Sequence, residues 1–410
     1  METAAPSVAA LRVAMVTDTF PPEINGVAMT LGRLADGLRR RGHRVALVRP
    51  RQVEDETAAA GADFAETLVA GMPMPRYPEL RLGLPAGRRL QRLWSADRPD
   101  IVHLATEGPL GWSALAAARR LGVPVSSAFH TNFDAYSRHY GLGWMKGLIT
   151  RYLRRFHNRT DATFVPTQAL CRDLAADGFR RLAVIARGVD TRLFTPARRS
   201  PLLRRRWGAG EQELVVAYVG RLAPEKNLGL VLSAFEQIRR RRQDARLLFV
   251  GDGPAAGALA RRHPGHIYAG MRRGEDLAAH YASADLFLFP SLTETYGNVT
   301  AEALASGLGV VAYAHAAAAD LIEDGRNGRS VPAGDEAAFI AAAVDLATSP
   351  PRLAATRARA APSVANIEWE IVHDRFAAAL AKLVAAHRPS PPAGRVLSPE
   401  GPAATGSPSR

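Results

Sequence analysis

The sequence contains one cysteine, Cys171, in 410 residues. A single cysteine excludes a disulfide framework and any zinc site built from cysteine thiolates. Cys171 lies within Ala169-Leu-Cys-Arg-Asp-Leu174, where its apolar neighbours favour packing of a helix over a role as a nucleophile.

Two motifs of nucleotide-handling enzymes are also missing. No Asp-x-Asp occurs, so the paired aspartates that clamp a metal ion in metal-dependent sugar-nucleotide enzymes are absent. A glycine-rich turn, Gly251-Asp-Gly-Pro-Ala-Ala-Gly257, has GxGxxxG spacing and contains Pro254. Because a dinucleotide fingerprint needs GxGxxG, a nicotinamide-dependent dehydrogenase is a weak alternative, and we expect this turn to border a ligand cleft instead.

No leader or membrane-spanning segment is visible in the sequence. Residues 1–10 lack both a basic region and a long apolar region. The nearest approach to a spanning helix, residues 303–322, is mostly alanine and glycine and is interrupted by Ser306, His315 and Asp320. We therefore expect a cytoplasmic protein.

Lysine is scarce in this basic chain. Of 53 basic residues, only Lys146, Lys226 and Lys382 are lysine, and the arginine excess beside abundant alanine indicates a compositional bias. The formal net charge of +14 raises the question of polyanionic partners: nucleic acid, an anionic membrane or phosphorylated substrates. Because no nucleic-acid motif and no basic cluster interleaved with aromatic residues is present, we expect no nucleic-acid partner.

What the sequence does contain is a repeated alternation of strands and helices. Residues 12–17 are an apolar run typical of a buried parallel strand, residues 27–38 carry apolar side chains at helical spacing, and residues 44–48 form the next strand. The alternation continues to residue 129 and restarts at residue 214. It predicts an α/β fold of two doubly wound, Rossmann-like parallel-sheet domains that face a cleft.

Changes in composition divide the chain. We predict an N-terminal domain over residues 11–195, a basic linker over 196–212 and a C-terminal domain over 213–365. A helix over 366–388 is expected to pack back toward the N-terminal domain. Residues 389–410 carry six prolines and almost no large apolar side chains, and they are expected to be a disordered tail.

The strongest functional pattern is Ser291-Leu-Thr-Glu-Thr-Tyr-Gly-Asn-Val-Thr-Ala-Glu302, which follows an apolar strand and opens a helix. Glu294 lies in the loop and Glu302 in the early helix, so both carboxylates can reach the same edge of the sheet. Backbone N–H groups near Gly297 and Asn298 point to that space, and a helix N-terminus favours phosphate. The carboxylates suit sugar or ribose hydroxyls, although Glu302 alone also suits an acid that balances the helix dipole.

A basic pair follows another strand. Val219-Gly-Arg-Leu-Ala-Pro-Glu-Lys-Asn227 places Arg221 and Lys226 directly after the first strand of the C-terminal domain. In a chain with three lysines, a lysine at the carboxyl end of a strand favours a role in neutralising a diphosphate over a solvated loop.

The N-terminal domain contributes two candidate positions at the same kind of edge. Asn25 and Gly26 lie between the first strand and its helix, where glycine permits close approach of a ligand. His130 follows a later strand and is placed to hydrogen-bond a substrate hydroxyl. Taken alone, a single histidine is more often a structural residue.

Together these motifs, with Thr106-Glu-Gly-Pro-Leu-Gly-Trp112 and His130-Thr-Asn-Phe133, resemble the retaining glycosyltransferases of family 4 over about residues 11–385. The subgroup they resemble is that of bacterial GDP-mannose-dependent α-mannosyltransferases, to which sulfoquinovosyltransferases and phosphatidylinositol mannosyltransferases are related. The resemblance implies the GT-B fold, with an acceptor-side N-terminal domain and a C-terminal domain that binds the nucleotide sugar.

The resemblance also assigns catalytic and donor-binding roles. It implies that Glu294 contacts the transferred sugar, that Glu302 binds the ribose, and that Arg221 and Lys226 hold the diphosphate. Gly297 and Asn298 are then donor-binding through the helix terminus.

In the N-terminal domain, the resemblance places His130 near the sugar and the Asn25–Gly26 loop near the phosphates. Two departures from the family pattern affect donor fit: relatives usually have proline at Gly309, and often a glycine-containing loop at residues 316–319.

The activity implied is metal-independent and needs no cofactor. An α-linked sugar, most simply mannose from GDP-mannose, passes with retention to a lipid or glycolipid acceptor. A UDP-dependent glucosyl- or sulfoquinovosyltransferase is the alternative. Front-face transfer, with the leaving phosphate helping to deprotonate the acceptor, is the working hypothesis.

A lipid acceptor raises the question of contact with an anionic membrane surface. Residues 143–161 and 81–94 combine apolar stripes with several arginines, which suits an interfacial surface on the inner face of the cytoplasmic membrane. The same stripes also suit helices that pack on the core with solvated arginines opposite.

Overall fold

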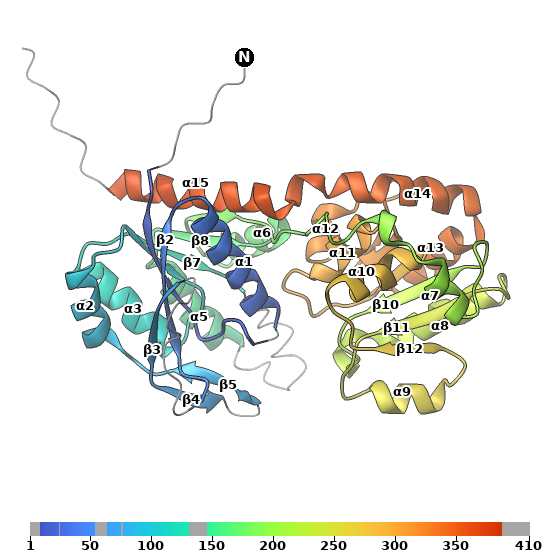
Figure 1. Ribbon diagram of the computed structural model, residues 1–410, viewed down its shortest axis with the longest axis horizontal. Helices are drawn as coiled ribbons and strands as arrows, with labels where there is room; N and C mark the ends of the chain where they lie inside the picture. The colour runs from blue at the N-terminus through green and yellow to red at the C-terminus, as the bar shows by residue number, and fades with distance from the viewer. Residues whose placement is uncertain (1–8, 24, 54–63, 75–76, 131–145, 388–410) are drawn as a thin grey trace, which may run out of the picture.

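The computed structural model describes residues 9–23, 25–53, 64–74, 77–130 and 146–387. Two α/β lobes lie side by side, and a long C-terminal helical band runs along both of them (Figure 1). The predicted fold class, two parallel-sheet domains, is confirmed within these residues.

The N-terminal domain is built on seven parallel strands. Their order across the sheet is β3 (Ala65–Val69), β2 (Arg44–Pro50), β1 (Arg12–Val16), β6 (Ile101–Leu104), β7 (Val125–Ala128), β8 (Ala162–Val165) and β9 (Leu182–Val184). A separate antiparallel pair consists of β4 (Gly71–Met74) and β5 (Tyr77–Gly83). The helices are α1 (Gly26–Arg40), α2 (Gly87–Ala96), α3 (Pro109–Arg120), α5 (Lys146–His157) and α6 (Gln168–Ala176).

The C-terminal domain repeats this plan with six parallel strands. Their order is β12 (Ile267–Gly270), β11 (Arg246–Val250), β10 (Val215–Val219), β13 (Leu286–Phe289), β14 (Gly309–Tyr313) and β15 (Arg329–Val331). The helices are α7 (Pro201–Arg206), α8 (Leu228–Arg239), α9 (Ala256–Arg262), α10 (Gly274–Ser283), α11 (Asn298–Ala305), α12 (Ala317–Leu321), α13 (Glu336–Thr348) and α14 (Pro350–Ser363), and α15 (Trp369–His387) follows them along the chain. Short 3-10 turns are η2 (Pro196–Arg198), η3 (Pro224–Lys226) and η4 (Ala365–Ile367).

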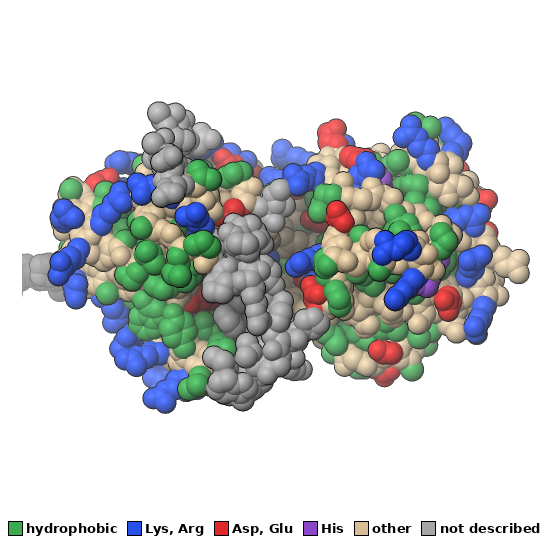
Figure 2. All heavy atoms as spheres, turned by 90° about the horizontal axis from the view of Figure 1, so that it is seen from below, with side chains coloured by type: hydrophobic (Ala, Val, Ile, Leu, Met, Phe, Trp, Pro, Cys, Tyr) green, Lys and Arg blue, Asp and Glu red, His purple; other side chains and the backbone are tan. Residues whose placement is uncertain are grey.

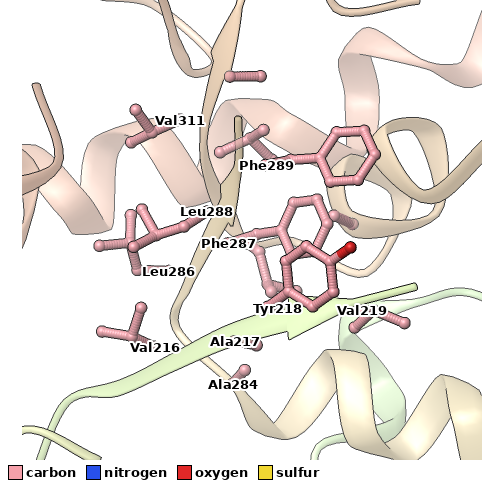
Figure 3. Close-up of a cluster of buried hydrophobic side chains, with 14 of the residues drawn as sticks. Val216, Ala217, Tyr218, Val219, Ala284, Leu286, Phe287, Leu288, Phe289 and Val311 are labelled. Atoms are coloured by element: carbon pink, nitrogen blue, oxygen red, sulfur yellow. The ribbon is translucent and has the colours of Figure 1, made fainter. Parts of the chain in front are cut away.

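The central strands are apolar on both faces because helices cover both sides of each sheet. In the C-terminal domain, all residues of β10 and β13 are buried. Figure 3 shows the rings of Tyr218, Phe287 and Phe289 packed together, with Phe287 and Phe289 stacked at a centroid distance of 5.7 Å. This rigid centre fixes the loops that follow β10 and β13.

The boundary between the domains differs in detail from the predicted one. Val189 and Phe194 belong to the core of the C-terminal domain, where the ring of Phe194 lies 5.7 Å from that of Tyr281. The segment that connects the two cores therefore lies before the predicted linker, around residues 185–188.

The predicted basic linker contains the turn η2 and the helix α7. Arg204 in α7 is 1% exposed, and Asp285 accepts hydrogen bonds from Arg204, Arg199 and Arg357 at 2.9–3.0 Å. The arginine run therefore anchors this segment to the start of β13.

Helix α15 lies over the N-terminal domain although it follows the C-terminal one (Figure 1). Val372, Phe376 and Leu380 are buried in the same core cluster as Leu31 of α1. Gly37 permits this packing, because a Cβ there would lie 2.3 Å from the ring of His373.

Candidate functional site

The two strongest sequence motifs meet in an ion pair. Lys226 Nζ lies 2.5 Å from Glu294 Oε1, and Ser291 Oγ donates a 2.9 Å hydrogen bond to the same oxygen. The two side chains are 17% and 19% exposed, so the pair is sheltered but reachable. They meet because β10 and β13 are neighbours in the sheet, and the carboxyl ends of adjacent parallel strands lie at one edge.

Glu302 lies behind this pair, in the middle of α11. The hydroxyl of Tyr281, a fully buried residue, donates a 2.9 Å hydrogen bond to Glu302 Oε2. Burial raises the pKa of Glu302 to about 7, against the smaller lowering effect of this hydrogen bond. The acid is therefore a titrating group near neutral pH.

The N-terminus of α11 has no side-chain cap. Gly297 stands at the N-cap position with φ +83°, and the buried Asn298 Oδ1 atom has no hydrogen-bond partner among the described residues. Uncapped backbone N–H groups at a helix start attract anions. This end of α11 faces the loop that carries Glu294.

Arg221 does not join the Lys226–Glu294 pair. Its side chain is 56% exposed, and its nearest described carboxylate is Glu225 at 4.0 Å. The loop that carries Arg221 rests on the Gly251–Gly253 turn: a Cβ on Gly251 would lie 2.0 Å from the Gly220 carbonyl oxygen, and one on Gly253 would lie 2.4 Å from that of Leu222. The glycine-rich turn thus supports the basic loop through backbone contact.

In the N-terminal domain, Asn25 caps helix α1. Its Oδ1 accepts from the N–H groups of Val27 and Ala28 at 3.1 and 2.8 Å. The amide therefore shapes the loop, and Gly26 is the exposed position beside it.

His130 and His103 line a small cavity of about 30 Å³ between α1, α15 and the interdomain segment. Neither ring nitrogen of His130 has a hydrogen-bond partner among the described residues, and the same holds for Nε2 of His103. Burial and the charge of Arg187 hold the pKa of His130 well below its ordinary value, so its imidazole is neutral. A neutral imidazole can both donate and accept a hydrogen bond.

Arg187, which the sequence patterns did not single out, connects the two halves of the site. It is 7% exposed, and a Cβ on Gly26 would lie 3.2 Å from its Nη1. Its guanidinium lies 5.8 Å from the ring centroid of Tyr296, whose hydroxyl donates a 2.9 Å hydrogen bond to the Arg187 carbonyl. Through Arg187, the Gly26 loop and His130 of one domain approach the Glu294 motif of the other.

One of the two departures from the family pattern also touches this site. Ala316 has φ +51° and ψ −133°, a conformation that favours glycine. On either side of it, His315 Nε2 lies 3.1 Å from the Glu294 carbonyl, and the Ala317 N–H donates a 2.8 Å hydrogen bond to the Tyr296 carbonyl. The strained turn holds the Glu294 loop. At the other departure, a Cβ on Gly309 would lie 2.6 Å from Leu353.

The Lys226–Glu294 pair and the open start of α11 thus lie at the carboxyl edge of the C-terminal sheet, with Arg187 of the interdomain segment beside Tyr296. The sequence profile of Glycosyltransferase Family 4 matches residues 24–193, and that of Glycosyl transferases group 1 matches residues 213–349. The GDP-mannose-dependent alpha-mannosyltransferase of Mycobacterium tuberculosis is 36% identical over 337 residues, which cover 79% of this chain and 85% of the relative.

A second relative and a solved structure extend the likeness. The GDP-mannose-dependent alpha-(1-6)-phosphatidylinositol monomannoside mannosyltransferase of Mycolicibacterium smegmatis is 31% identical over 83% of this chain and 90% of its own length. HepE of Anabaena, solved in complex with UDP, superposes with a TM-score of 0.71 at 18% identity, covering 91% of this chain and 100% of its own. The chain belongs to glycosyltransferase family 4, and it is a hexosyltransferase with the GT-B fold.

Within the described part of the chain, no group of three or more His, Cys, Asp or Glu side chains is arranged to hold a metal ion. No described helix is long and apolar enough to span a membrane.

Proposed function

We propose that the protein transfers a mannosyl residue from GDP-mannose, with retention of configuration, to a hydroxyl group of a lipid or glycolipid. The observation that carries this proposal is the Lys226–Glu294 pair beside the open start of α11, in a chain 36% identical to a GDP-mannose-dependent alpha-mannosyltransferase. The relative whose name includes phosphatidylinositol monomannoside supports the choice of acceptor class.

The diphosphate lies against the cations and the helix terminus in this proposal. Lys226 and the N–H groups at Gly297 and Asn298 receive phosphate oxygens, and the exposed Arg221 turns in when the donor binds. These groups stabilise the negative charge that develops on the departing GDP. Because Lys226 is already held by Glu294, it needs little reorganisation at that moment.

The sugar and the ribose contact the acids. Glu294 accepts hydrogen bonds from sugar hydroxyls, Glu302 binds the ribose, and the neutral imidazole of His130 contacts the sugar from the opposite domain. Gly26, beside its capping residue Asn25, lets the backbone approach the phosphates.

The reaction breaks the bond between the anomeric carbon and the phosphate oxygen. The acceptor oxygen forms the new glycosidic bond on the same face of the sugar, and its proton passes to the departing diphosphate. Atoms and charge balance without a covalent enzyme intermediate.

A donor screen tests this proposal. Release of nucleoside diphosphate is measured with GDP-mannose, UDP-glucose and UDP-sulfoquinovose, with and without vesicles that contain phosphatidylinositol or diacylglycerol. We expect turnover with GDP-mannose and its acceleration by an acceptor lipid. Turnover with a UDP-sugar alone would assign the alternative donor, and no turnover with any of the three donors would contradict the proposal.

We further propose that the acceptor is reached at a membrane-facing surface of the N-terminal domain, defined by Met72, Leu84, Leu93, Leu148 and Tyr152. These side chains are 37–61% exposed. Figure 2 shows apolar side chains gathered on this lobe, with arginines around them. Arg88, Arg89 and Arg92 of α2 are among the exposed cations. Apolar contact together with cations suits an anionic lipid surface.

The two predicted apolar stripes divide between core and surface. In α5, Leu153 and Phe156 are buried whereas Leu148 and Tyr152 are exposed, and in α2 Leu90 and Trp94 are buried whereas Leu93 is exposed. Trp144 and Met145 lie outside the described residues. Only the exposed half is available for lipid.

Vesicle sedimentation at low salt tests the membrane-facing surface. We expect wild-type protein to sediment with anionic vesicles, and Leu148→Glu to sediment much less. Leu202→Glu is the matched control, because Leu202 is 52% exposed on the other domain. Failure of the wild type to sediment, or an equal loss in the control, would refute membrane contact through this surface.

A further inference from the structure

We propose that Arg187 is a donor-binding residue, which supplies from the interdomain segment a guanidinium that contacts the diphosphate of the nucleotide sugar. This inference rests on the proposed function and adds a third cation to Arg221 and Lys226. It begins from a buried charge that lacks a counterion.

Arg187 is 7% exposed, yet its guanidinium donates no hydrogen bond and joins no ion pair among the described residues, and its Nε is buried without a partner. Arginine stays charged in proteins, and burying an unpaired charge is costly. Burial lowers the pKa of Arg187 to about 10, which still leaves the side chain a cation at neutral pH. The other buried arginines among the described residues are paired: Arg204 lies 3.0 Å from Asp285, and Arg49 lies 2.7 Å from Glu66.

The surroundings of Arg187 are those of a ligand site, since they come from both domains. Gly26 approaches Nη1 so closely that a Cβ there would lie at 3.2 Å. Tyr296, directly before the uncapped start of α11, places its ring 5.8 Å from the guanidinium carbon. The charge of Glu294 is close enough to raise the pKa of Arg187, and the charge of Arg187 lowers the pKa of His130.

The guanidinium is held in place without being neutralised. The Tyr296 hydroxyl bonds the Arg187 carbonyl, and the aromatic ring attracts the cation through its face. Arg187 lines the cavity of about 30 Å³, and its buried Nε has no hydrogen-bond partner. Among the described residues no carboxylate or carbonyl pairs with its terminal amino groups, which leaves them available to an anion.

A diphosphate is the anion that fits this arrangement. Its oxygens accept paired N–H donors in the geometry that guanidinium offers. Tyr296, whose ring lies beside the guanidinium, directly precedes the open start of α11, and Lys226 pairs with Glu294 two residues before Tyr296. Because Arg187 connects the two domain cores, a phosphate bound to it would also hold the domains together around the donor.

The test compares Arg187→Met and Arg187→Lys with the control Arg192→Gln, whose side chain is 88% exposed. Calorimetry measures the affinity of wild-type and variant proteins for GDP, for UDP and for guanosine, and thermal unfolding is followed with and without the nucleotide that the wild type binds.

We expect Arg187→Met to bind GDP at least 30-fold more weakly while guanosine binding is unchanged, and to lose the rise in unfolding temperature that GDP causes. The unfolding temperature of the free variant should not fall, because an unpaired buried charge has been removed. Arg187→Lys should fall between the two, and Arg192→Gln should match the wild type.

Three results would overturn the inference. Wild-type affinity for GDP in Arg187→Met would exclude phosphate contact. Failure of both Arg187 variants to fold, or a lower unfolding temperature of the free Met variant with GDP affinity intact, would assign Arg187 a structural role. If the wild type binds neither GDP nor UDP, the proposed function itself fails. If the wild type binds GDP and Arg187→Met binds it equally well, only the role of Arg187 is refuted.

Discussion

Lys226 Nζ and Glu294 Oε1 lie 2.5 Å apart and join two loops that are 68 residues distant in sequence. The contact gives each side chain a defined position before any donor arrives. It also means that removing either partner takes a direct charged contact from the other in a sheltered place.

Substitution of either residue of this pair should therefore lower activity strongly, and the effects of the two substitutions should not add. We expect Lys226→Met and Glu294→Gln each to lower kcat/KM for the donor by at least ~100-fold, since one oxyanion-type contact contributes about 10²–10³-fold. The double variant should lose much less than the product of the two. Steady-state kinetics of the four proteins measures the coupling.

Lys382→Met, at an exposed position of α15, is the control for loss of a lysine and should leave activity unchanged. Near-normal kcat/KM in either single variant would refute the placement of the pair in the donor site.

Glu302 should make donor binding depend on pH. Its pKa is raised to about 7 by burial, so the carboxyl becomes ionised in the folded protein only as the pH rises through that value. The ionised form accepts ribose hydroxyls better, so we expect GDP-mannose, whose diphosphate does not titrate near neutrality, to bind more tightly at pH 8 than at pH 6. Calorimetry across this range checks the trend, and Glu302→Gln should flatten it.

The same group sets a pH dependence of stability with the opposite sign. Because the folded-state pKa lies above the ordinary value, the folded state binds more protons than the unfolded chain between about pH 4.5 and 7. Its contribution to stability is full below this window and is lost as the pH rises through 7. The unfolding temperature of the wild type should therefore fall relative to that of Glu302→Gln as the pH rises from about 4.5 to 7, because glutamine does not titrate. Parallel curves for the two proteins across this range would contradict the raised pKa.

The turn at Gly251 should not tolerate a side chain. A Cβ would lie 2.0 Å from the Gly220 carbonyl oxygen, and φ is +134°. We expect Gly251→Ala to lower the free energy of unfolding by at least about 2 kcal/mol, since such a backbone conformation alone costs 1–3 kcal/mol. It should also reduce activity, because the displaced loop carries Arg221. Gly229→Ala is the matched control: it lies in α8 with nothing within 4 Å of the added Cβ, and should be neutral or stabilising.

The meeting of Lys226 and Glu294 could be predicted from sequence because each follows an apolar run typical of a buried parallel strand. The carboxyl ends of such strands share one edge, so two reactive loops after neighbouring strands must lie close together. For the same reason the two-sheet fold followed from the alternation of apolar runs and helical spacing.

Arg187 could not be found in this way. It stands between two domains, follows no motif, and is one of many arginines, so neither residue type nor position distinguishes it. Its burial depends on residues distant in sequence, among them Gly26 of one domain and Tyr296 of the other. The grouping of Arg199, Arg204 and Arg357 on Asp285 was hidden for a similar reason, since these ion pairs join residues up to 86 positions apart.

Ala316 offers a test of strain beside the active loop. With φ +51° and ψ −133°, it occupies a region that glycine reaches without steric cost. Ala316→Gly should raise the free energy of unfolding by about 1 kcal/mol, because relief of 1–3 kcal/mol outweighs the 0.5–1 kcal/mol of added backbone entropy. Since His315 and Ala317 hold the Glu294 loop, a freer turn should also lower kcat/KM for the donor severalfold.

Ala354→Gly, at an exposed position within α14, is the control for this prediction and should instead lower the free energy of unfolding, because glycine weakens a helix interior. Chemical denaturation and donor kinetics of the three proteins measure both effects, and a destabilised Ala316→Gly protein would show that the turn is not strained.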